Sequence, residues 1–331
     1  MNIKYDELKA LFEEKLVKYG VSKEIVMRSA AIFADNTLDG VYSHGINRFP
    51  RVISYIEKGY IKPNEKAVKI DGFGAFERWD GCYGMGNTNA EDMMNRAIEL
   101  SHIHGIGAIG LRNTNHWMRG GYYGWQAADS GCIGICWTNT TNNMPPWGGK
   151  TSKIGNNPFV IAIPRDNGEH VVVDCAMSQF AYGKLETLRL KGEMLPVDGG
   201  YDEKGELTRN PGEIEKTRRI LPMGYWKGSS LSIALDLAAA LLSGGNSTRD
   251  ISFLPDEIGL SQVFMAIDNR KINSDEFSER LISDTLSFIE SSEPISKPVR
   301  YPGKGSLDYR RRQLENGIEV DDGVYNTIVA L

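Results

Sequence analysis

Residues 105–110 read Gly-Ile-Gly-Ala-Ile-Gly, and the neighbours of this stretch decide the fold class. The spacing matches the G-x-G-x-x-G pattern of dinucleotide-binding doubly wound sheets. That pattern works only where a strand precedes the glycines and a helix follows, so that the helix N-terminus meets the pyrophosphate. Here a helical pattern over residues 88–104 precedes the glycines, which themselves run into a strand. The stretch therefore argues against a doubly wound dinucleotide-binding sheet.

Outward from these glycines, the middle of the chain alternates strand-like runs with helical patterns. Two of the runs flank Pro-Arg-Asp-Asn-Gly-Glu at 164–169, whose Asp-Asn-Gly turn predicts an antiparallel hairpin and hence a mixed sheet. The expected fold class is α/β (α+β), a mixed β-sheet body with helices. We expect strands at 67–70, 106–111, 133–138, 159–163, 170–175 and 262–267, and helices at 88–104, 121–129 and 229–242.

Both ends of the chain have helical patterns instead. Apolar residues recur at helical spacing over residues 6–20, 22–40 and 49–58, and again over 275–291, 306–316 and 321–331. A linker with two prolines occupies residues 294–298. We therefore expect two domains, a helical one made of residues 1–66 and 295–331 and a mixed α/β one made of residues 67–294.

Composition excludes several classes of protein. The chain has 331 residues, of which 41% are hydrophobic and 24% charged, as in ordinary globular proteins. A formal net charge of -5, with no long run of either sign, argues against nucleic acid or an anionic membrane as the main partner. We see no signal-peptide pattern and no run of 18 apolar residues. Four cysteines without a C-x-x-C pair predict reduced thiols in the cytoplasm, and no His/Cys/Asp grouping has metal-ligand spacing.

Residues 41–50, Val-Tyr-Ser-His-Gly-Ile-Asn-Arg-Phe-Pro, carry the strongest chemical pattern. His44 is one of only five histidines, and histidine can deliver a proton near neutral pH. Arg48 follows four residues later and can fork onto a carboxylate, and in a helix this spacing would place both groups on one face. With the Ser43 hydroxyl beside them, they suit a substrate with a carboxylate next to a carbonyl. The alternative is a helix-end histidine and a surface arginine.

Three further polar segments are candidates for ligand binding. His116 lies in Asn-Thr-Asn-His-Trp-Met-Arg-Gly-Gly at 113–121, just after a strand; it could bind a substrate oxygen or simply hold the turn. Pro-Gly-Lys-Gly-Ser at 302–306 and Trp-Lys-Gly-Ser-Ser at 226–230 each open a helix with glycine and lysine. Uncovered N–H groups and the helix dipole would favour an anion at both. Each could instead be a well-capped helix start.

Several long runs resemble the malate/L-lactate dehydrogenase type 2 family, and the similarity covers essentially the whole chain. Among the most specific are Gly-Val-Tyr-Ser-His-Gly at 40–45, Asn-His-Trp-Met-Arg-Gly-Gly at 115–121 and Arg-Ile-Leu-Pro-Met-Gly-Tyr-Trp-Lys-Gly at 219–228. The resemblance implies NAD(P)H-dependent reduction of a 2-keto acid on a non-Rossmann NAD(P)-binding fold. It also implies a homodimer with its active sites near the subunit boundary.

The resemblance also assigns residues. The family's proton donor falls on His44, with Ser43, Arg48 and His116 around the substrate, so that the helical domain carries the proton donor. NADH is the expected cofactor, and NADPH stays open. Another keto acid, malate-like, lactate-like or ureidoglycolate-like, and a nucleotide-binding protein without turnover are the alternatives. The cofactor-contacting stretches fall on His170, Val171, Val172, Val173, Asp174, Cys175 and Ala176, on Trp226 and Lys227, and on Gly303, Lys304 and Gly305.

Overall fold

A seven-stranded sheet forms the body of the molecule in the computed structural model, which describes residues 1–331. Its strand order is β2-β3-β4-β10-β5-β6-β7, and only the β3–β4 pair is parallel. The sheet is therefore mixed, as the hairpin turn before β7 predicted. The strands are β2 (Val68–Phe73), β3 (Phe76–Asp80), β4 (Ile106–Thr114), β5 (Cys132–Thr138), β6 (Phe159–Ile163), β7 (Val171–Cys175) and β10 (Leu260–Asp268).

The glycine run that opens β4 is explained by packing on both faces of the sheet. Gly105 ends α4 (Gly86–His104) with a φ of 87°, a left-handed conformation that glycine adopts without strain. A Cβ on Gly107 would lie 2.1 Å from the Ala97 carbonyl oxygen of α4, and one on Gly110 would lie 2.5 Å from the Leu242 carbonyl oxygen of α8 (Trp226–Ser243). The glycines thus admit a helix on each face and hold no phosphate.

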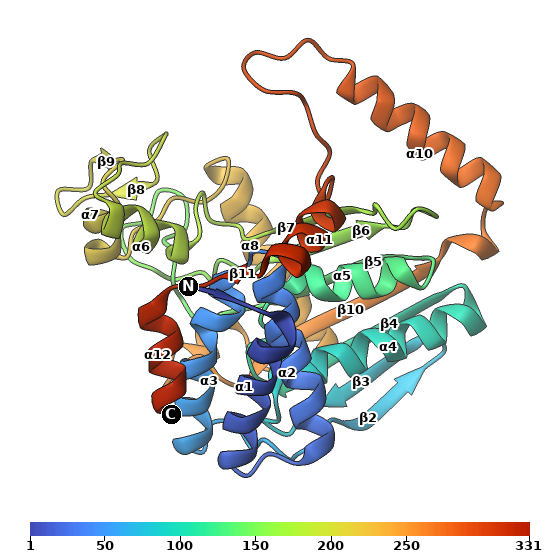
Figure 1. Ribbon diagram of the computed structural model, residues 1–331, viewed down its shortest axis with the longest axis horizontal. Coiled ribbons are helices and arrows are strands. Elements are labelled where there is room, and N and C mark those ends of the chain that lie inside the picture. The colour runs from blue at the N-terminus through green and yellow to red at the C-terminus, as the bar shows by residue number, and fades with distance from the viewer.

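Helices cover the sheet in two layers (Figure 1). On one face α4 packs on β4 and β10, and α5 (Gly120–Asp129) packs on β5 and β6, around buried Trp117, Tyr123 and Phe264. On the other face α8 lies against β4, β10 and β5. No helix in the structure is both long and apolar enough to cross a membrane. The mixed α/β class predicted from the sequence is confirmed.

A helical unit lies beside the sheet and holds both termini (Figure 1). It consists of α1 (Tyr5–Lys18), α2 (Lys23–Leu38), α3 (Phe49–Glu57) and α12 (Asp322–Ala330), with β1 (Asn2–Ile3) paired to β11 (Ile318–Glu319). Its core packs the rings of Phe12, Phe33 and Phe49 against one another in tilted and edge-to-face pairs and takes in Ile318 and Ile328 from the end of the chain. The division of the chain into two domains stays a prediction.

Several parts of the structure were not predicted from the sequence, and the most substantial are β3 and a small lobe at one end of the sheet (Figure 1). The lobe contains α6 (Tyr182–Lys191), α7 (Pro211–Thr217), β8 (Gly200–Tyr201) and β9 (Leu207–Thr208). Its Leu185 and Ile214 share a hydrophobic core with Trp137 and Val263 of the sheet. The remaining elements are short α9 (Thr248–Ile251) and η3 (Asn269–Lys271), the projecting α10 (Asp275–Glu290), and α11 (Ser306–Asn316).

Candidate active site

The segment that carries His44 is not one helix, as its spacing suggested, but two single turns. These are η1 (Tyr42–His44) and η2 (Ile46–Arg48), broken at Gly45. A Cβ on Gly45 would lie 2.3 Å from the Thr37 hydroxyl of α2, so only glycine lets the chain pass this close. The same hydroxyl accepts a hydrogen bond from the Ile46 N–H at 2.9 Å. Packing on α2, rather than helical periodicity, therefore positions His44 and Arg48.

The His44 side chain has one ring nitrogen engaged. Nδ1 lies 3.0 Å from the Ser43 hydroxyl, and Nε2 makes no hydrogen bond within the protein. The ring stacks on that of His116, with centroids 5.6 Å apart and planes inclined by 21°. Burial, with the positive charges of Arg48 and Arg119, lowers the pKa of His44 to about 4. In the ligand-free protein His44 is therefore a neutral base at pH 7.

Arg48 has only one loose ionic partner. Its Nη2 lies 3.5 Å from Oε1 of Glu257, while the other carboxylate oxygen of Glu257 accepts the Thr141 N–H at 3.3 Å. Burial lowers the pKa of Arg48, an effect that the Glu257 carboxylate offsets in part. Strong arginine–carboxylate pairs are bidentate and shorter than this one. The Arg48 guanidinium therefore keeps N–H donors for a second carboxylate. Its partner Glu257 was not predicted from the sequence as a site residue.

His116 serves the turn and faces the site at once. Its Nδ1 accepts the Met118 N–H at 3.0 Å, in a turn where Met118 has a φ of 70°. An accepting Nδ1 leaves Nε2 as the protonated nitrogen of the neutral ring, which makes it a hydrogen-bond donor. Burial and the nearby Arg48 charge lower the pKa of His116 well below its usual range. The ring is therefore neutral at pH 7.

Arg119 and Asp174 connect the histidines to the edge of the sheet. Arg119 Nη1 lies 2.6 Å from Oδ2 of Asp39, the residue that ends α2. Asp174 on β7 accepts the Gly121 N–H at 2.7 Å, and a Cβ on Gly121 would lie 2.9 Å from Asp174 Oδ2 and 3.4 Å from Arg119 Nε. Burial raises the pKa of Asp174, partly offset by the Gly121 N–H and by Arg119. One end of β7 thus lies beside Arg119, whose charge acts on His44.

The three stretches expected to contact a cofactor meet along β7. The Val172 N–H donates to the Pro302 carbonyl at 3.0 Å, which attaches residues 303–305 to one end of the strand. Beyond the other end, the Met223 N–H donates to the Met177 carbonyl at 2.8 Å. A Cβ on Gly228 would lie 2.9 Å from that carbonyl oxygen, so the start of α8 packs there as well. Segments far apart in sequence therefore line one strand.

Two of the expected cofactor contacts differ in detail from the sequence analysis. The start of α11 was expected to present uncovered N–H groups and a free lysine charge. Instead the Gly305 N–H donates to Glu169 Oε2 at 3.2 Å, and Lys304 is ion-paired with Glu290 of α10. This helix start is already partly neutralised by the protein's own carboxylates. Local sequence could not reveal that, because Glu290 reaches Lys304 from a separate helix.

His170 is the second difference, because its side chain is fully engaged in holding the fold. Nδ1 accepts the Arg165 N–H at 2.9 Å, and Nε2 lies 2.9 Å from Asp129 Oδ1. The ring is 3% exposed and packs on Trp125 at 5.0 Å between centroids. Only the backbone of residue 170 remains for a ligand. By contrast, Trp226 is 58% exposed with Lys227 Nζ 5.8 Å from its ring centroid, which suits a flat ring and a phosphate.

The small lobe reaches the segment that carries His44. A Cβ on Gly183, at the start of α6, would lie 3.2 Å from Ser43 Cβ. The neighbouring Tyr182 hydroxyl donates to the Asn143 carbonyl at 2.7 Å, in the polar loop that also contacts Glu257 through Thr141. The start of α6, a helix that the sequence did not predict, therefore lies against Ser43.

Comparison with known proteins gives consistent matches over the whole chain. Residues 3–329 match the family model described as malate/L-lactate dehydrogenase. The chain is 48% identical to a 2,3-diketo-L-gulonate reductase of Escherichia coli (strain K12) over 334 aligned positions, covering 100% of both chains.

Solved structures agree with this. The sulfolactate dehydrogenase of Methanocaldococcus jannaschii is 29% identical with a TM-score of 0.88, covering 99% of this chain and 95% of that one. A malate dehydrogenase of Entamoeba histolytica has the same fold, with 24% identity and a TM-score of 0.93, and the match covers 100% of this chain and 96% of that one.

Proposed function

The chain belongs to the malate/L-lactate dehydrogenase family, and we propose that it reduces 2,3-diketo-L-gulonate to 3-keto-L-gulonate with a nicotinamide cofactor. The observation that carries the proposal is the grouping of His44, Arg48 and His116 at one end of the β7 edge. Similarity to the 2,3-diketo-L-gulonate reductase supports the choice of substrate. A 2-keto acid has the two groups that this constellation recognises, a carboxylate and an adjacent carbonyl.

Arg48 binds the substrate carboxylate in this proposal, because its guanidinium has donors that Glu257 does not occupy. The Nε2–H of His116 and the Ser43 hydroxyl orient the C2 carbonyl. When bound, the nicotinamide cofactor supplies a hydride to C2. His44 gives its proton to the oxygen that becomes the C2 hydroxyl, a role that typically contributes a factor of about 10²–10⁴ in rate.

Proton donation requires His44 to be charged, although its pKa is about 4 in the ligand-free protein. Burial is the largest cause of that low pKa, and the positive charges of Arg48 and Arg119 lower it further. A substrate carboxylate placed on Arg48 adds a negative charge next to the ring and favours the imidazolium. Substrate binding therefore raises the pKa of His44, and the histidine takes up the proton that it later donates.

For the cofactor we propose NADH, with NADPH as the alternative, lying along residues 170–176 between the starts of α8 and α11. The donor set fits such a ligand in part. Trp226 and Lys227 offer an exposed ring and a charge. At the α11 start a Cβ on Gly305 would lie 2.8 Å from a guanidinium nitrogen of Arg300, so a positive charge lies beside that glycine. Glu169 and Glu290 already occupy part of the α11 start, so a phosphate there would compete with these carboxylates.

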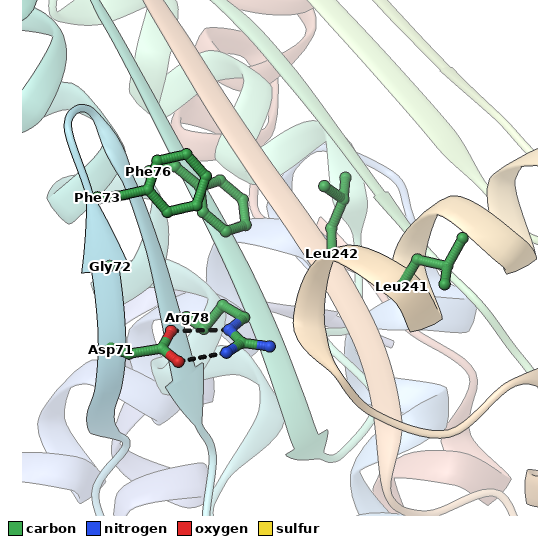
Figure 2. A pocket seen from close by; sticks show the side chains of 7 residues that line it. All are labelled: Asp71, Gly72, Phe73, Phe76, Arg78, Leu241 and Leu242. Carbon is green, nitrogen blue, oxygen red and sulfur yellow. Dashed lines mark hydrogen bonds and ion pairs between the residues drawn. The ribbon is translucent and has the colours of Figure 1, made fainter.

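We further propose that the protein is a cytoplasmic homodimer. One face of α8 exposes Leu231, Ile233, Leu237 and Leu241. This helix ends at a groove of about 540 Å³, which Leu241 and Leu242 line together with residues of the β2–β3 hairpin. Figure 2 shows the helix end opposite that hairpin, whose Phe73 is exposed. The groove contains none of the proposed site residues, and a second copy of the chain is the occupant expected from the family resemblance. Sedimentation at micromolar concentration, with Leu237→Glu as the weakened variant, tests this.

The deciding experiment is NADH oxidation assayed with 2,3-diketo-L-gulonate, pyruvate and oxaloacetate. We expect the highest kcat/KM with 2,3-diketo-L-gulonate. Preference for pyruvate or oxaloacetate would assign a different keto acid to the same site. NADH binding without oxidation by any of the three would contradict the reductase proposal and favour a nucleotide-binding protein.

A further inference from the structure

A chain of charged side chains runs from helix α11 to the residues around His44. Arg310 of α11 is ion-paired with Asp35, and its Nη1 lies 3.0 Å from Asp39 Oδ1. The other oxygen of Asp39 lies 2.6 Å from Arg119 Nη1. The Asp39 side chain is 17% exposed and that of Arg119 is 13% exposed. One carboxylate therefore joins two arginines from separate parts of the chain.

The surroundings of the network define which charges act on His44. The ring stacks on His116 from the segment between β4 and α5, and the charges of Arg48 from η2 and Arg119 from that same segment lower its pKa. Arg119 in turn faces Asp39 from α2 and Asp174 from β7. On the far side of the network, Asp35 accepts the hydroxyl of Tyr5 from α1 at 3.2 Å. Asp39 is thus the one carboxylate that contacts both Arg119 and Arg310 of α11.

We propose that Asp39 is a positioning residue that joins Arg310 to Arg119 and thereby sets the positive charge facing His44. Two arginines share the carboxylates of Asp35 and Asp39, so the network is close to neutral as a whole. Loss of Asp39 leaves Arg119 with an excess of positive charge, whereas loss of Arg310 leaves an excess of negative charge. The start of α11, expected to contact the cofactor, lies on the same helix as Arg310.

The catalytic part of this inference rests on the proposed role of His44 as proton donor. The reductive rate requires protonated His44, so it falls as pH rises through the pKa of that group in the substrate complex. Asp39→Asn should move this descending limb of kcat to lower pH, by on the order of half a pH unit for one charge at intermediate effective dielectric. Arg310→Gln should move it to higher pH by a similar amount, and the double variant should return it toward the wild-type position.

Opposite shifts of the kcat limb in Asp39→Asn and Arg310→Gln distinguish a positioning role from a general loss of structure. Removing either member of the network can lower the melting temperature, but structural loss has no reason to move the two limbs in opposite directions. Asp92→Asn is the matched control, since Asp92 is a carboxylate paired with Arg28 of α2 and is not part of this network. It should leave the limb in place.

A second measurement does not depend on turnover. The Cε1–H resonance of His44, assigned by its absence in His44→Gln, reports the titration of the ring in the ligand-free protein. Its midpoint should be lower in Asp39→Asn and higher in Arg310→Gln. Midpoints that do not move, or that move in the same direction, overturn the inference even if the enzyme reduces keto acids. The expected opposite shifts would support it even if the substrate proposal failed. If Asp39→Asn does not fold, the direction found for Arg310→Gln decides alone.

Discussion

His44 and His170 lie in two regions expected to contact ligands, and the protein holds them in opposite ways. His170 is packed against Trp125 with both ring nitrogens hydrogen-bonded, one to a backbone N–H and one to Asp129. His44 has one nitrogen beside Ser43 and the other without a protein partner, in the field of two arginines. Satisfied hydrogen bonds mark a histidine that stabilises the fold, whereas an unpaired nitrogen in an unfavourable field is available for chemistry.

Replacing His44 tests this contrast most directly. His44→Gln should lower kcat for keto-acid reduction by at least about a hundredfold, because glutamine can hydrogen-bond but cannot deliver a proton. NADH should still bind, since the cofactor stretches lie along β7. Steady-state kinetics and NADH fluorescence titration measure the two properties separately. Turnover close to that of the wild type would remove His44 from the mechanism.

Arg48→Lys tests the charge that accompanies His44. A planar fork can hold a carboxylate through two hydrogen bonds, while an ammonium offers a point charge. A hydrogen bond to a charged group contributes roughly 1.5–3 kcal/mol, so kcat/KM should fall by on the order of tenfold to a hundredfold. The carboxamide analogue of the keto acid serves as the control substrate. An equal loss on both substrates would exclude Arg48 as the carboxylate ligand.

His170→Ala should act on stability instead. It leaves the Arg165 N–H without its acceptor in a buried setting, a loss of about 1–3 kcal/mol in the free energy of unfolding. Urea unfolding measures this, and kcat should change little at temperatures where the variant is folded. A hundredfold fall in kcat without loss of stability would make His170 a catalytic group and reverse the comparison.

The proposed rise in the pKa of His44 can be measured with oxamate, a carboxylate analogue of a 2-keto acid. In the ligand-free protein the pKa is about 4, lowered by burial and by the two arginines. An added carboxylate favours the charged ring, so bound oxamate should raise the titration midpoint of His44 by about one pH unit or more. Binding should accordingly take up protons and weaken as pH rises. If saturating oxamate leaves the titration midpoint of His44 unchanged, oxamate does not bind next to His44.

Lys304→Ala has the smallest expected effect. Its ion pair with Glu290 is partly exposed, so the lysine charge is already offset before a phosphate arrives. We expect the NADH dissociation constant to rise a few-fold at low salt and the difference to shrink as salt rises. Glu290→Gln is the matched variant and should tighten NADH slightly. If the NADH dissociation constant is unchanged in both variants, this helix start is a structural cap and not a cofactor contact.

Local patterns in the sequence predict much of the fold but few of the partners in the site. Apolar alternation predicts six of the strands, yet β3 reads Phe-Glu-Arg-Trp-Asp, and its buried Glu77 is stabilised by Lys69 and Arg96 from other elements. Similarly, His44 and Arg48 are evident from residue type, but the helical spacing first used to join them is wrong. Glu257 and Asp39 escape detection because their partners lie on distant segments of the chain.

The core of the helical unit that carries His44 combines side chains that are synthesised early with side chains that are synthesised late. Helices α1 to α3 leave the ribosome first, whereas Ile318, Val320 and Ile328, which complete their core, leave it last. All strands of the large sheet lie between these points in the sequence. The sheet can therefore assemble on the nascent chain while the first helices still expose an apolar face. His44, the proposed proton donor, therefore reaches its final setting only after residues 318–328 have been made, because their side chains pack in the core that contains Ile46 and Phe49.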